Sequence, residues 1–318
     1  MRLLVFASGR GSNFNALLNA SKKGELTSKI VGLICDKDCP AIEIANSNSI
    51  PVTILRPKEY SNKEEYISTL VKTVKRYAPD YILLAGYMRI IPTELIEEYP
   101  LKIINIHPSL LPAFQGKDAI LQAWQAGVKE TGVTLHFVND KLDQGAILAQ
   151  RKVKVEGTLE ELEAKIHNVE HELYVNTVKE LTQNPFDTLV VGKCLAGKNC
   201  RYDGGNEYSP RVAKLMQGFK GKVVEVCPEL SIGMGVPRIT SEIIDGKFIT
   251  KDGQDLTKKM KDFAEKFISE QLSSSKRILA VMAEKSPSCG KIKVKGIFTC
   301  ALMERFQKAI LVVADEEL

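Results

Sequence analysis

The sequence predicts an α/β protein of two domains: an open, mostly parallel sheet with helices on both faces, followed by a smaller α/β domain. Short apolar runs alternate with amphipathic stretches over the first half of the chain, the pattern of parallel strands connected by covering helices. A long helical pattern, Thr158–Leu181, is then followed by Pro185, which cannot continue a helix and restricts the residue before it. We therefore expect domains at 1–184 and 185–318.

The elements of the first domain follow from length and periodicity. In the stretch Lys63–Tyr77, apolar residues recur at Tyr66, Leu70 and Val74, which is helical spacing. The other predicted helices are Phe14–Lys22, Ala41–Asn46 and Thr158–Leu181. Short apolar runs predict strands at Leu3–Phe6, Lys29–Ile34, Val52–Leu55, Tyr81–Ala85, Ile103–Ile106, Thr134–Val138 and Ala146–Val153.

The second domain repeats this pattern on a smaller scale. Its amphipathic segment Leu256–Leu272 predicts a helix. Its strands are expected at Thr188–Val191, Lys222–Val226, Ile278–Ala283 and Ala309–Val313. The chain of 318 residues is long enough for the two cores that this division requires.

Composition narrows the class of protein. The 44 basic and 39 acidic residues are interleaved, without the clustered basic stripe of a nucleic-acid binder, and the net charge of +5 suits anionic small substrates. No signal peptide and no apolar stretch long enough for a membrane helix is found, so we expect a cytoplasmic protein that contacts neither nucleic acid nor membrane. The seven cysteines are then expected to be free thiols or ligands, and five of them lie after residue 190.

A glycine-containing loop, Ser8–Asn13, follows the first predicted strand and precedes a helix. Free backbone N–H groups at a helix N-terminus favour an anion, and glycine allows a phosphate to approach the backbone. The spacing is neither that of a dinucleotide-binding loop nor that of a P-loop. A tight turn with a Ser or Asn cap is the alternative interpretation.

A second constellation lies where the strand Ile103–Ile106 enters a proline-bounded loop. Asn105 and His107 are two residues apart, so on a strand they project to the same face. In open parallel sheets, ligands bind beyond the carboxyl ends of the strands. An amide donor and an imidazole there suit the oxyanion of an acyl transfer, and Asp143, in a turn before a strand, supplies an orienting carboxylate. A core histidine and a turn aspartate are the structural alternatives.

Residues 1–183 resemble the phosphoribosylglycinamide formyltransferases. The segments that carry the resemblance are Ser8–Asn13, Ala85–Ile90, Asn105–Gly116, Gly132–Val138 and Leu142–Gly145. The resemblance implies the formyltransferase fold and transfer of the formyl group of 10-formyltetrahydrofolate, a co-substrate, to the amine of glycinamide ribonucleotide in de novo purine synthesis. No metal takes part in the catalysis of that family.

The resemblance also implies residue roles. Asn105 and His107 would stabilise the tetrahedral oxyanion, while Asp143 orients and charges His107 and helps to move the amine proton. The ribonucleotide is expected at Gly11, Ser12, Asn13, Lys63 and Glu170, the last at its glycinamide end. Folate is expected at Met88, Arg89, Ile90 and Ile91. His136, His167 and His171 are interpreted as structural.

Two positions depart from the family pattern. Lys63 stands where members usually have arginine, and lysine lacks the bidentate fork, which predicts weaker phosphate binding. Gly116–Ile120 stands where many members carry histidines. Methionyl-tRNA formyltransferases share the core and are the alternative for this half. Their loop after the prolines is usually rich in arginine and tryptophan, and they carry a basic C-terminal domain, whereas this chain has Ala113–Gly116 and a cysteine-bearing half.

Cysteines of the second half follow three successive predicted strands. Cys194, Cys227 and Cys289 each have glycine or proline nearby, and the ends of such strands converge at one edge of a sheet. Thiolates from three loops suit an iron–sulfur cluster or zinc, although no CxxC pair is present. Buried thiols in a small core are the structural alternative. Cys35 and Cys39, in the first half, are interpreted as ordinary thiols.

Residues 188–318 resemble the family that includes the thiouracil desulfurases. The motifs are C-L-x-G-x-x-C-R-Y-D-G from Cys194, C-P-E from Cys227 and S-P-S-C-G from Ser286. The resemblance implies a [4Fe–4S] cluster held by Cys194, Cys227 and Cys289, with Cys200 as a candidate fourth ligand, and desulfuration of a thiolated pyrimidine. Asp203, Glu229 and Ser286 are the polar candidates near its open iron.

One departure concerns the loop after Cys289. The family usually inserts a glycine-rich stretch there, whereas here Lys291–Lys295 leads directly to Gly296. The shorter loop is expected to alter substrate access or cluster stability. Two interpretations of the whole chain therefore stay open: a bifunctional enzyme, or a formyltransferase with a non-catalytic regulatory or binding module.

Overall fold

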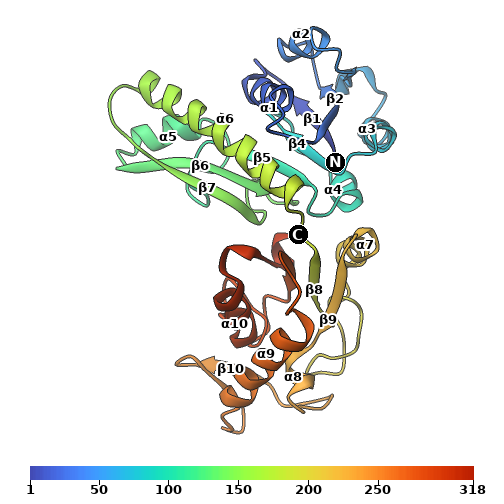
Figure 1. Cartoon of the computed structure of the whole chain (residues 1–318), viewed down its shortest axis with the longest axis vertical. Coiled ribbons are helices and arrows are strands. Elements are labelled where there is room, and N and C mark those ends of the chain that lie inside the picture. The colour runs from blue at the N-terminus through green and yellow to red at the C-terminus, as the bar shows by residue number, and fades with distance from the viewer. The chain divides into compact units, whose positions relative to one another are not determined.

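The computed structural model describes all 318 residues, and they form two compact units, Met1–Asn184 and Pro185–Leu318. Each unit is an α/β fold in its own right (Figure 1). No helix in the chain combines the length and the apolar character needed to cross a membrane.

A seven-stranded sheet forms the centre of the N-terminal unit, in the order β3-β2-β1-β4-β5-β6-β7. Strands β1 to β5 are parallel, and β6 runs antiparallel to both of its neighbours. The strands are β1 (Arg2–Ala7), β2 (Lys29–Cys35), β3 (Val52–Ile54), β4 (Tyr81–Leu84), β5 (Ile103–His107), β6 (Glu130–Phe137) and β7 (Ile147–Lys154). Every residue of β1 except Arg2 is buried, as expected for a strand covered on both faces. The predicted fold class is thus confirmed.

Helices cover this sheet on both faces. The helices are α1 (Ser12–Lys22), α2 (Ala41–Asn46), α3 (Lys63–Tyr77), α4 (Thr93–Glu98), α5 (Ala119–Gln125) and α6 (Leu159–Gln183). α3 and α4 share one apolar core with β1, β2 and β4, in which Leu4, Phe6 and Leu70 are buried. α1 and α6 pack against each other, and both lie in front of the sheet in Figure 1.

Local sequence explains how the helices begin. Thr158 and Glu161 form a capping box at the start of α6, and Asn62 caps α3. The buried Tyr174 of α6 donates its hydroxyl towards the carbonyls of Leu84 (3.2 Å) and Ile104 (3.3 Å). α6 is therefore fixed to the end of β4 and to the residue of β5 that precedes Asn105.

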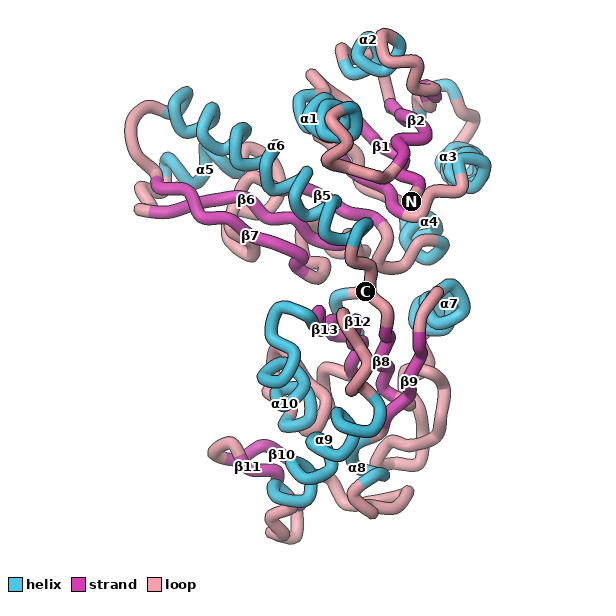
Figure 2. Tube along the Cα trace, viewed as in Figure 1, coloured by secondary structure: helices cyan, strands magenta, loops and turns pink.

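The C-terminal unit has a four-stranded parallel sheet in the order β13-β12-β8-β9. Its strands are β8 (Thr188–Gly192), β9 (Lys222–Val226), β12 (Ile278–Met282) and β13 (Ile310–Ala314), with a separate hairpin of β10 (Ser241–Ile244) and β11 (Lys247–Thr250). The helices are α7 (Pro210–Gly218), α8 (Pro228–Ser231), α9 (Thr257–Gln271) and α10 (Ile297–Phe306) (Figure 2). The rings of Phe263 and Phe267 on α9 pack against Phe298 on α10.

Several short elements have no counterpart in the sequence predictions. These are α4, α5, α7, α8, α10 and the β10–β11 hairpin. The helices among them have ten or fewer residues, and too few turns repeat for apolar periodicity to identify them. The hairpin is largely exposed on β10, so its strand lacks a continuous apolar run.

Candidate functional site

The candidate site of the N-terminal unit lies at the carboxyl ends of β1, β4 and β5. The loop after β1 is joined to the segment after β4, because the Ser8 backbone N–H donates to the Gly86 carbonyl (3.1 Å) and the Ser8 hydroxyl accepts from the Met88 N–H (3.0 Å). The predicted phosphate loop and the predicted folate segment are therefore neighbours. β5 ends beside them with Asn105 and His107.

Gly11 gives the phosphate loop its shape. It precedes the first turn of α1 with a φ of 76°, in the left-handed region that favours glycine. A Cβ at this position would lie 2.8 Å from the Cβ of Ala41. Ser12 is exposed and Asn13 is buried. The turn therefore brings its backbone close to α2 and leaves the start of α1 accessible to an anion.

Replacement of Gly11 by alanine is expected to lower the free energy of unfolding by about 1–3 kcal/mol, through backbone strain and the clash with Ala41. Gly24→Ala is the matched control, since Gly24 has a φ of 74° but a Cβ added there would meet no atom within 4 Å. Urea titrations should show the larger loss for Gly11→Ala, and only this variant should weaken anion binding at the loop. Equal losses would show that crowding at Gly11 is unimportant.

Four polar side chains meet at the end of β5. The Asn105 amide nitrogen donates to Nε2 of His136 (3.2 Å), whose Nδ1–H donates to the Phe137 carbonyl (2.8 Å). Asp143 lies between two rings: its Oδ2 is 3.5 Å from Nδ1 of His107, and its Oδ1 is 3.6 Å from Nε2 of His136. The three residues predicted to act together are thus brought together, with His136 as an additional member.

The charges of this group favour an ionised aspartate. Burial alone would raise the pKa of Asp143, but the adjacent His136 ring, a hydrogen bond from the Gly116 N–H and the charge of His107 hold that pKa below its usual value. His107 faces acceptors on both sides, because its Nε2 donates to the Phe114 carbonyl (2.8 Å) and its Nδ1 faces Asp143. Only a doubly protonated ring satisfies both acceptors.

Glu170 of α6 lies beside the start of α1. Glu170 is buried, and its carboxylate accepts from Nδ1 of His167 (2.9 Å) and, more weakly, from the Asn13 amide (3.5 Å). Asn13 and Glu170, which the sequence assigns to the ribonucleotide, are therefore adjacent. Lys63 is exposed at the first position of α3.

The predicted folate segment exposes apolar side chains. Met88 is 70% exposed and Ile90 is 84% exposed, whereas Ile91 is buried. Arg89 lies 3.9 Å from the carboxylate of Asp36. Exposed large apolar side chains next to a polar centre are typical of a ligand site for a flat, largely apolar group.

Four of the five cysteines of the C-terminal unit gather at one edge of its sheet. Cys194 follows β8, Cys227 follows β9, and Cys289 lies in the loop after β12; these three strands are adjacent and parallel. Together with Cys200 they line a cavity of about 340 Å³. Burial is the main cause that raises the pKa of Cys194 to about 11 and that of Cys200 to about 12. Neutral thiols are therefore expected unless a cation lies among them.

A hydrogen-bonded carboxylate forms another wall of this cavity. Glu229 accepts from the hydroxyls of Ser286 (3.2 Å) and Ser288 (2.9 Å) through one oxygen, and from the guanidinium of Arg238 through the other. Arg238 also donates to the Cys200 carbonyl (2.9 Å). Asp203, by contrast, is exposed and does not belong to the cavity lining.

The loop after Cys289 is held by a buried carboxylate. Glu284 is 1% exposed and accepts backbone N–H groups from Lys291 (2.9 Å), Ile292 (2.8 Å) and Lys293. Burial opposes ionisation, but these hydrogen bonds lower the pKa of Glu284. The Glu284 carboxylate therefore anchors the backbone of this short segment beside β12, and ion pairs of Lys291 with Glu317 and of Lys293 with Glu316 hold it further.

The cavity offers four cysteine sulfurs as possible metal ligands. No three Cys, His, Asp or Glu side chains lie close enough together to hold one metal ion, so a single zinc does not fit. A cluster spreads its ligands farther apart, and four sulfur donors around one cavity have the chemistry that it requires.

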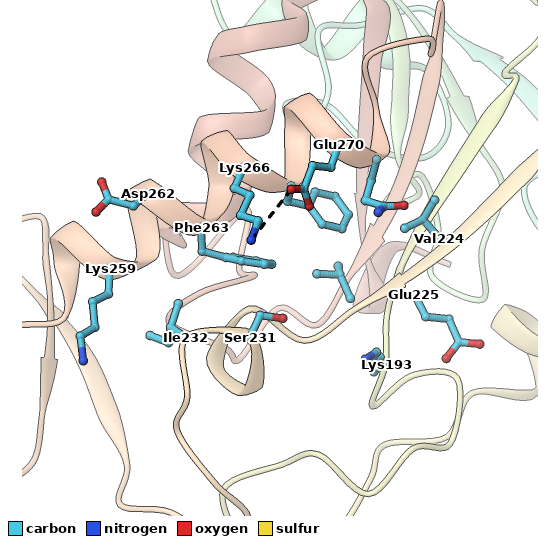
Figure 3. Close-up of a pocket in the computed structure, with 13 residues that line it drawn as sticks. Lys193, Val224, Glu225, Ser231, Ile232, Lys259, Asp262, Phe263, Lys266 and Glu270 are labelled. Atoms are coloured by element: carbon cyan, nitrogen blue, oxygen red, sulfur yellow. Dashed lines mark ion pairs between the residues drawn. The ribbon is translucent and has the colours of Figure 1, made fainter.

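A larger cavity of about 730 Å³ lies between α9 and β9 (Figure 3). Phe263 lies at its centre, with Lys259, Asp262 and Lys266 along α9, and Lys266 approaches Glu270 to 3.9 Å. Its lining contains no cysteine or histidine, and its charges are mixed. The cavity with the cysteines is therefore the candidate site of this unit.

Three residues of the two sites were missed or differently interpreted from the sequence. His136 was expected to be structural, but it contacts Asn105 and Asp143. It lies opposite Asn105 in the β5–β6 pair, so a correct prediction of this strand pairing would have identified it. Ser288, which stands within the S-P-S-C-G motif, and Arg238 were not assigned to the site. Only the folded loops show that both reach Glu229.

Comparisons with known proteins divide at the same place as the structure. Residues 1–178 match the family model described as formyl transferase, and residues 189–313 match the one described as 2-thiouracil desulfurase. The phosphoribosylglycinamide formyltransferase of Bacillus subtilis is 42% identical over 183 residues, which cover 57% of this chain and 94% of that protein. The protein of the same name from Haemophilus influenzae is 35% identical over 185 residues, covering 57% and 87%.

Solved structures give the same result for the N-terminal unit. Phosphoribosylglycinamide formyltransferase from Bacillus halodurans superposes with a TM-score of 0.56 at 44% identity, covering 58% of this chain and 96% of that one. Glycinamide ribonucleotide transformylase 1 from Geobacillus kaustophilus superposes with a TM-score of 0.55 at 47% identity, covering 57% and 97%.

Proposed function

The chain belongs to the formyl transferase family, and from this premise we propose that its N-terminal unit transfers the formyl group of 10-formyltetrahydrofolate to the amine of glycinamide ribonucleotide in purine synthesis. The observation that carries the proposal is the group of Asn105, His107 and Asp143 at the end of β5, with Asp143 3.5 Å from His107. The 42% identity to a phosphoribosylglycinamide formyltransferase supports the choice of acceptor.

The chemistry begins with attack of the amine on the formyl carbon. The carbonyl oxygen becomes an oxyanion, and the Asn105 amide has a second N–H to donate to it while the first stays on His136. The His107 ring, charged between Phe114 and Asp143, places positive charge beside the oxyanion. The amine proton passes to Asp143, directly or through water. Collapse of the intermediate breaks the bond to N10 of the folate, which takes up the proton that Asp143 received, and leaves a formamide on the ribonucleotide.

Substrate positions follow from the same geometry. The N–H groups of Gly11, Ser12 and Asn13 at the start of α1 would receive the phosphate, with Lys63 as a further cation. Glu170, beside Asn13, would receive the glycinamide end. The exposed side chains of Met88 and Ile90 would contact the folate ring, with Arg89 and Ile91 in the same segment.

The assay for this function is direct. The purified chain with 10-formyltetrahydrofolate should release tetrahydrofolate at a rate that depends on added glycinamide ribonucleotide. Methionyl-tRNA is the control acceptor, since methionyl-tRNA formyltransferase was the alternative for this half. Release that is independent of the ribonucleotide, or that requires the tRNA, would refute the proposal.

We propose that the C-terminal unit is an iron–sulfur-dependent desulfurase of thiolated pyrimidines. Cys194, Cys227 and Cys289 would hold a [4Fe–4S] cluster, with Cys200 as the further candidate, and the cluster would supply an open iron for the substrate sulfur. Support comes from the match of residues 189–313 to the 2-thiouracil desulfurase family and from the shared cavity. Glu229 and Ser286 would bind the pyrimidine or hold a proton at its edge.

The alternative for the C-terminal unit is a non-catalytic regulatory or binding module. Iron and sulfide analysis distinguishes this module from a desulfurase. With both activities the chain would be bifunctional. We place it in the cytoplasm as part of the proposal, a location supported by its seven free cysteines, because disulfides are rare there.

A further inference from the structure

Two cysteines lie side by side at the end of β2. Cys35 is the last residue of this strand, Cys39 follows four residues later, and their Sγ atoms are 3.6 Å apart. Cys35 is fully buried, whereas Cys39 is partly exposed. The sulfurs of a disulfide are about 2 Å apart, so a movement of about 1.6 Å would bring this pair to bonding distance. The proposed formyl transfer uses neither thiol.

The backbone of Cys35 is held on both sides by the sheet. Cys35 is aligned with Ala7 of β1 and with Ile54 of β3, and its carbonyl accepts from the Leu55 N–H (2.8 Å). Cys39, in contrast, lies in the loop before α2. Because the ladder of hydrogen bonds fixes Cys35, formation of a disulfide would pull Cys39 and the start of α2 towards the sheet.

The start of α2 contacts the loop that is expected to receive the phosphate. The Ala41 N–H donates to the Gly9 carbonyl (3.4 Å), and a Cβ at Gly11 would lie only 2.8 Å from the Cβ of Ala41. Closely packed groups transmit a displacement to their neighbours instead of absorbing it. A shift of Cys39 would therefore displace the backbone of this loop, whose N–H groups bind the anion.

We propose that Cys35 and Cys39 form a redox-sensitive site, at which oxidation by a hydroperoxide closes a disulfide and weakens the binding of the ribonucleotide phosphate. The effect on binding rests on the proposed function of the N-terminal unit, whereas the formation of the disulfide does not. A reversible disulfide of this kind is compatible with the cytoplasm, where the few disulfides are mostly transient.

The oxidation begins at Cys39, because Cys39 is accessible and burial raises the pKa of Cys35. The Cys39 sulfur attacks one oxygen of hydrogen peroxide; an S–O bond forms, the O–O bond breaks, and the leaving oxygen takes the thiol proton and departs as water. The Cys35 sulfur then attacks the Cys39 sulfur. The S–S bond forms, the S–O bond breaks, and the oxygen leaves with the Cys35 proton as a second water. The two thiols lose two electrons, and the peroxide gains them.

Peptide mapping detects the disulfide without reference to activity. The exposed Lys37 lies between the two cysteines, so trypsin separates them in the reduced chain, whereas the disulfide joins the two peptides. The full chain is treated with hydrogen peroxide, blocked with iodoacetamide under denaturing conditions and digested. We expect joined peptides in wild type and their separation by dithiothreitol. Absence of the joined peptides would overturn the inference.

Steady-state kinetics measure the consequence for binding. Oxidation of wild type should raise KM for the ribonucleotide by at least about fivefold with kcat within about twofold, because hydrogen bonds to a charged phosphate are weakened outside the reacting atoms. Dithiothreitol should restore KM. Its action distinguishes the disulfide from a sulfoxide at the exposed Met88, which requires a dedicated reductase.

Two variants complete the experiment. Cys39→Ser, at a partly exposed position, should keep the KM of reduced wild type before and after peroxide, and Cys300→Ser on α10 should respond as wild type does. Oxidation elsewhere in the chain would affect all three proteins alike. A disulfide that leaves KM unchanged, or an equal rise of KM in Cys39→Ser, would overturn the inference. A reduced wild type without transfer to the ribonucleotide would refute the proposed function and the effect on binding with it, while peptide mapping would still decide the disulfide.

Discussion

Replacing Asp143 by asparagine is expected to lower kcat for formyl transfer by about 10²- to 10⁴-fold, the range for loss of a positioned acid–base group. Asparagine keeps the size of the side chain, and its oxygen can still accept from the Gly116 N–H, which donates to Asp143 at 2.9 Å. What disappears is the negative charge between His107 and His136. The proton acceptor and the charge that supports the His107 cation are lost together.

Steady-state kinetics with the ribonucleotide and 10-formyltetrahydrofolate measure this effect, and Asp140→Asn, exposed in the same loop, is the control. A kcat within about threefold of wild type for Asp143→Asn would remove Asp143 from the mechanism.

The pH dependence of the free energy of unfolding has a definite sign. Because the folded-state pKa of Asp143 is lowered, its contribution to stability is present above the unfolded pKa and is lost as the pH falls through the folded pKa. In urea titrations at decreasing pH, the Asp143→Asn variant should therefore lose less free energy of unfolding than wild type.

Replacing Cys289 by serine is expected to abolish cluster binding in the C-terminal unit, so that iron and acid-labile sulfide fall from about four each per chain to below about one. Serine offers no soft thiolate ligand, and Cys289 is buried in the wall of the cavity that Cys194 and Cys227 also line. Desulfuration of 2-thiouracil should disappear with the iron.

The measurement requires protein purified without oxygen, analysed for iron, sulfide and visible absorption. Cys194→Ser, at a partly exposed position, gives a second variant in case the buried change affects folding, and Cys300→Ser on α10 is the control because Cys300 is outside the cavity lining. Wild-type protein without iron after reconstitution would contradict the cluster and favour a binding module. Formyl transfer should be unaffected by all three changes.

Much of the N-terminal unit could be predicted from sequence because its strands are buried on both faces. Runs such as Leu3–Phe6 and Tyr81–Ala85 are apolar without alternation, and the structure has strands at Arg2–Ala7 and Tyr81–Leu84. The convergence of Asn105 with Asp143 followed from strand ends and the family resemblance. The place of His136 depends on antiparallel pairing of β6 with β5, which apolar periodicity does not reveal.

In the C-terminal unit, the sequence predicts the positions of the cysteines but not those of the polar site residues. The three cysteines could be placed at strand ends, since parallel strands finish at the same edge. Asp203 was predicted beside them on motif alone, and the structure leaves it exposed, while Ser288 and Arg238 reach Glu229 instead. Loop conformation decides these positions, and it follows from contacts distant in sequence, such as those of Glu284 with Lys291.

The most direct test of the central claim follows the formyl carbon itself. Wild-type chain is incubated with glycinamide ribonucleotide and 10-formyltetrahydrofolate labelled with carbon-13 in the formyl group, and the products are identified by NMR and mass spectrometry. The account predicts that the label appears as a formamide on the ribonucleotide amine, and that Asp143→Asn slows its appearance. Label recovered as free formate at the same rate with and without the ribonucleotide would contradict it.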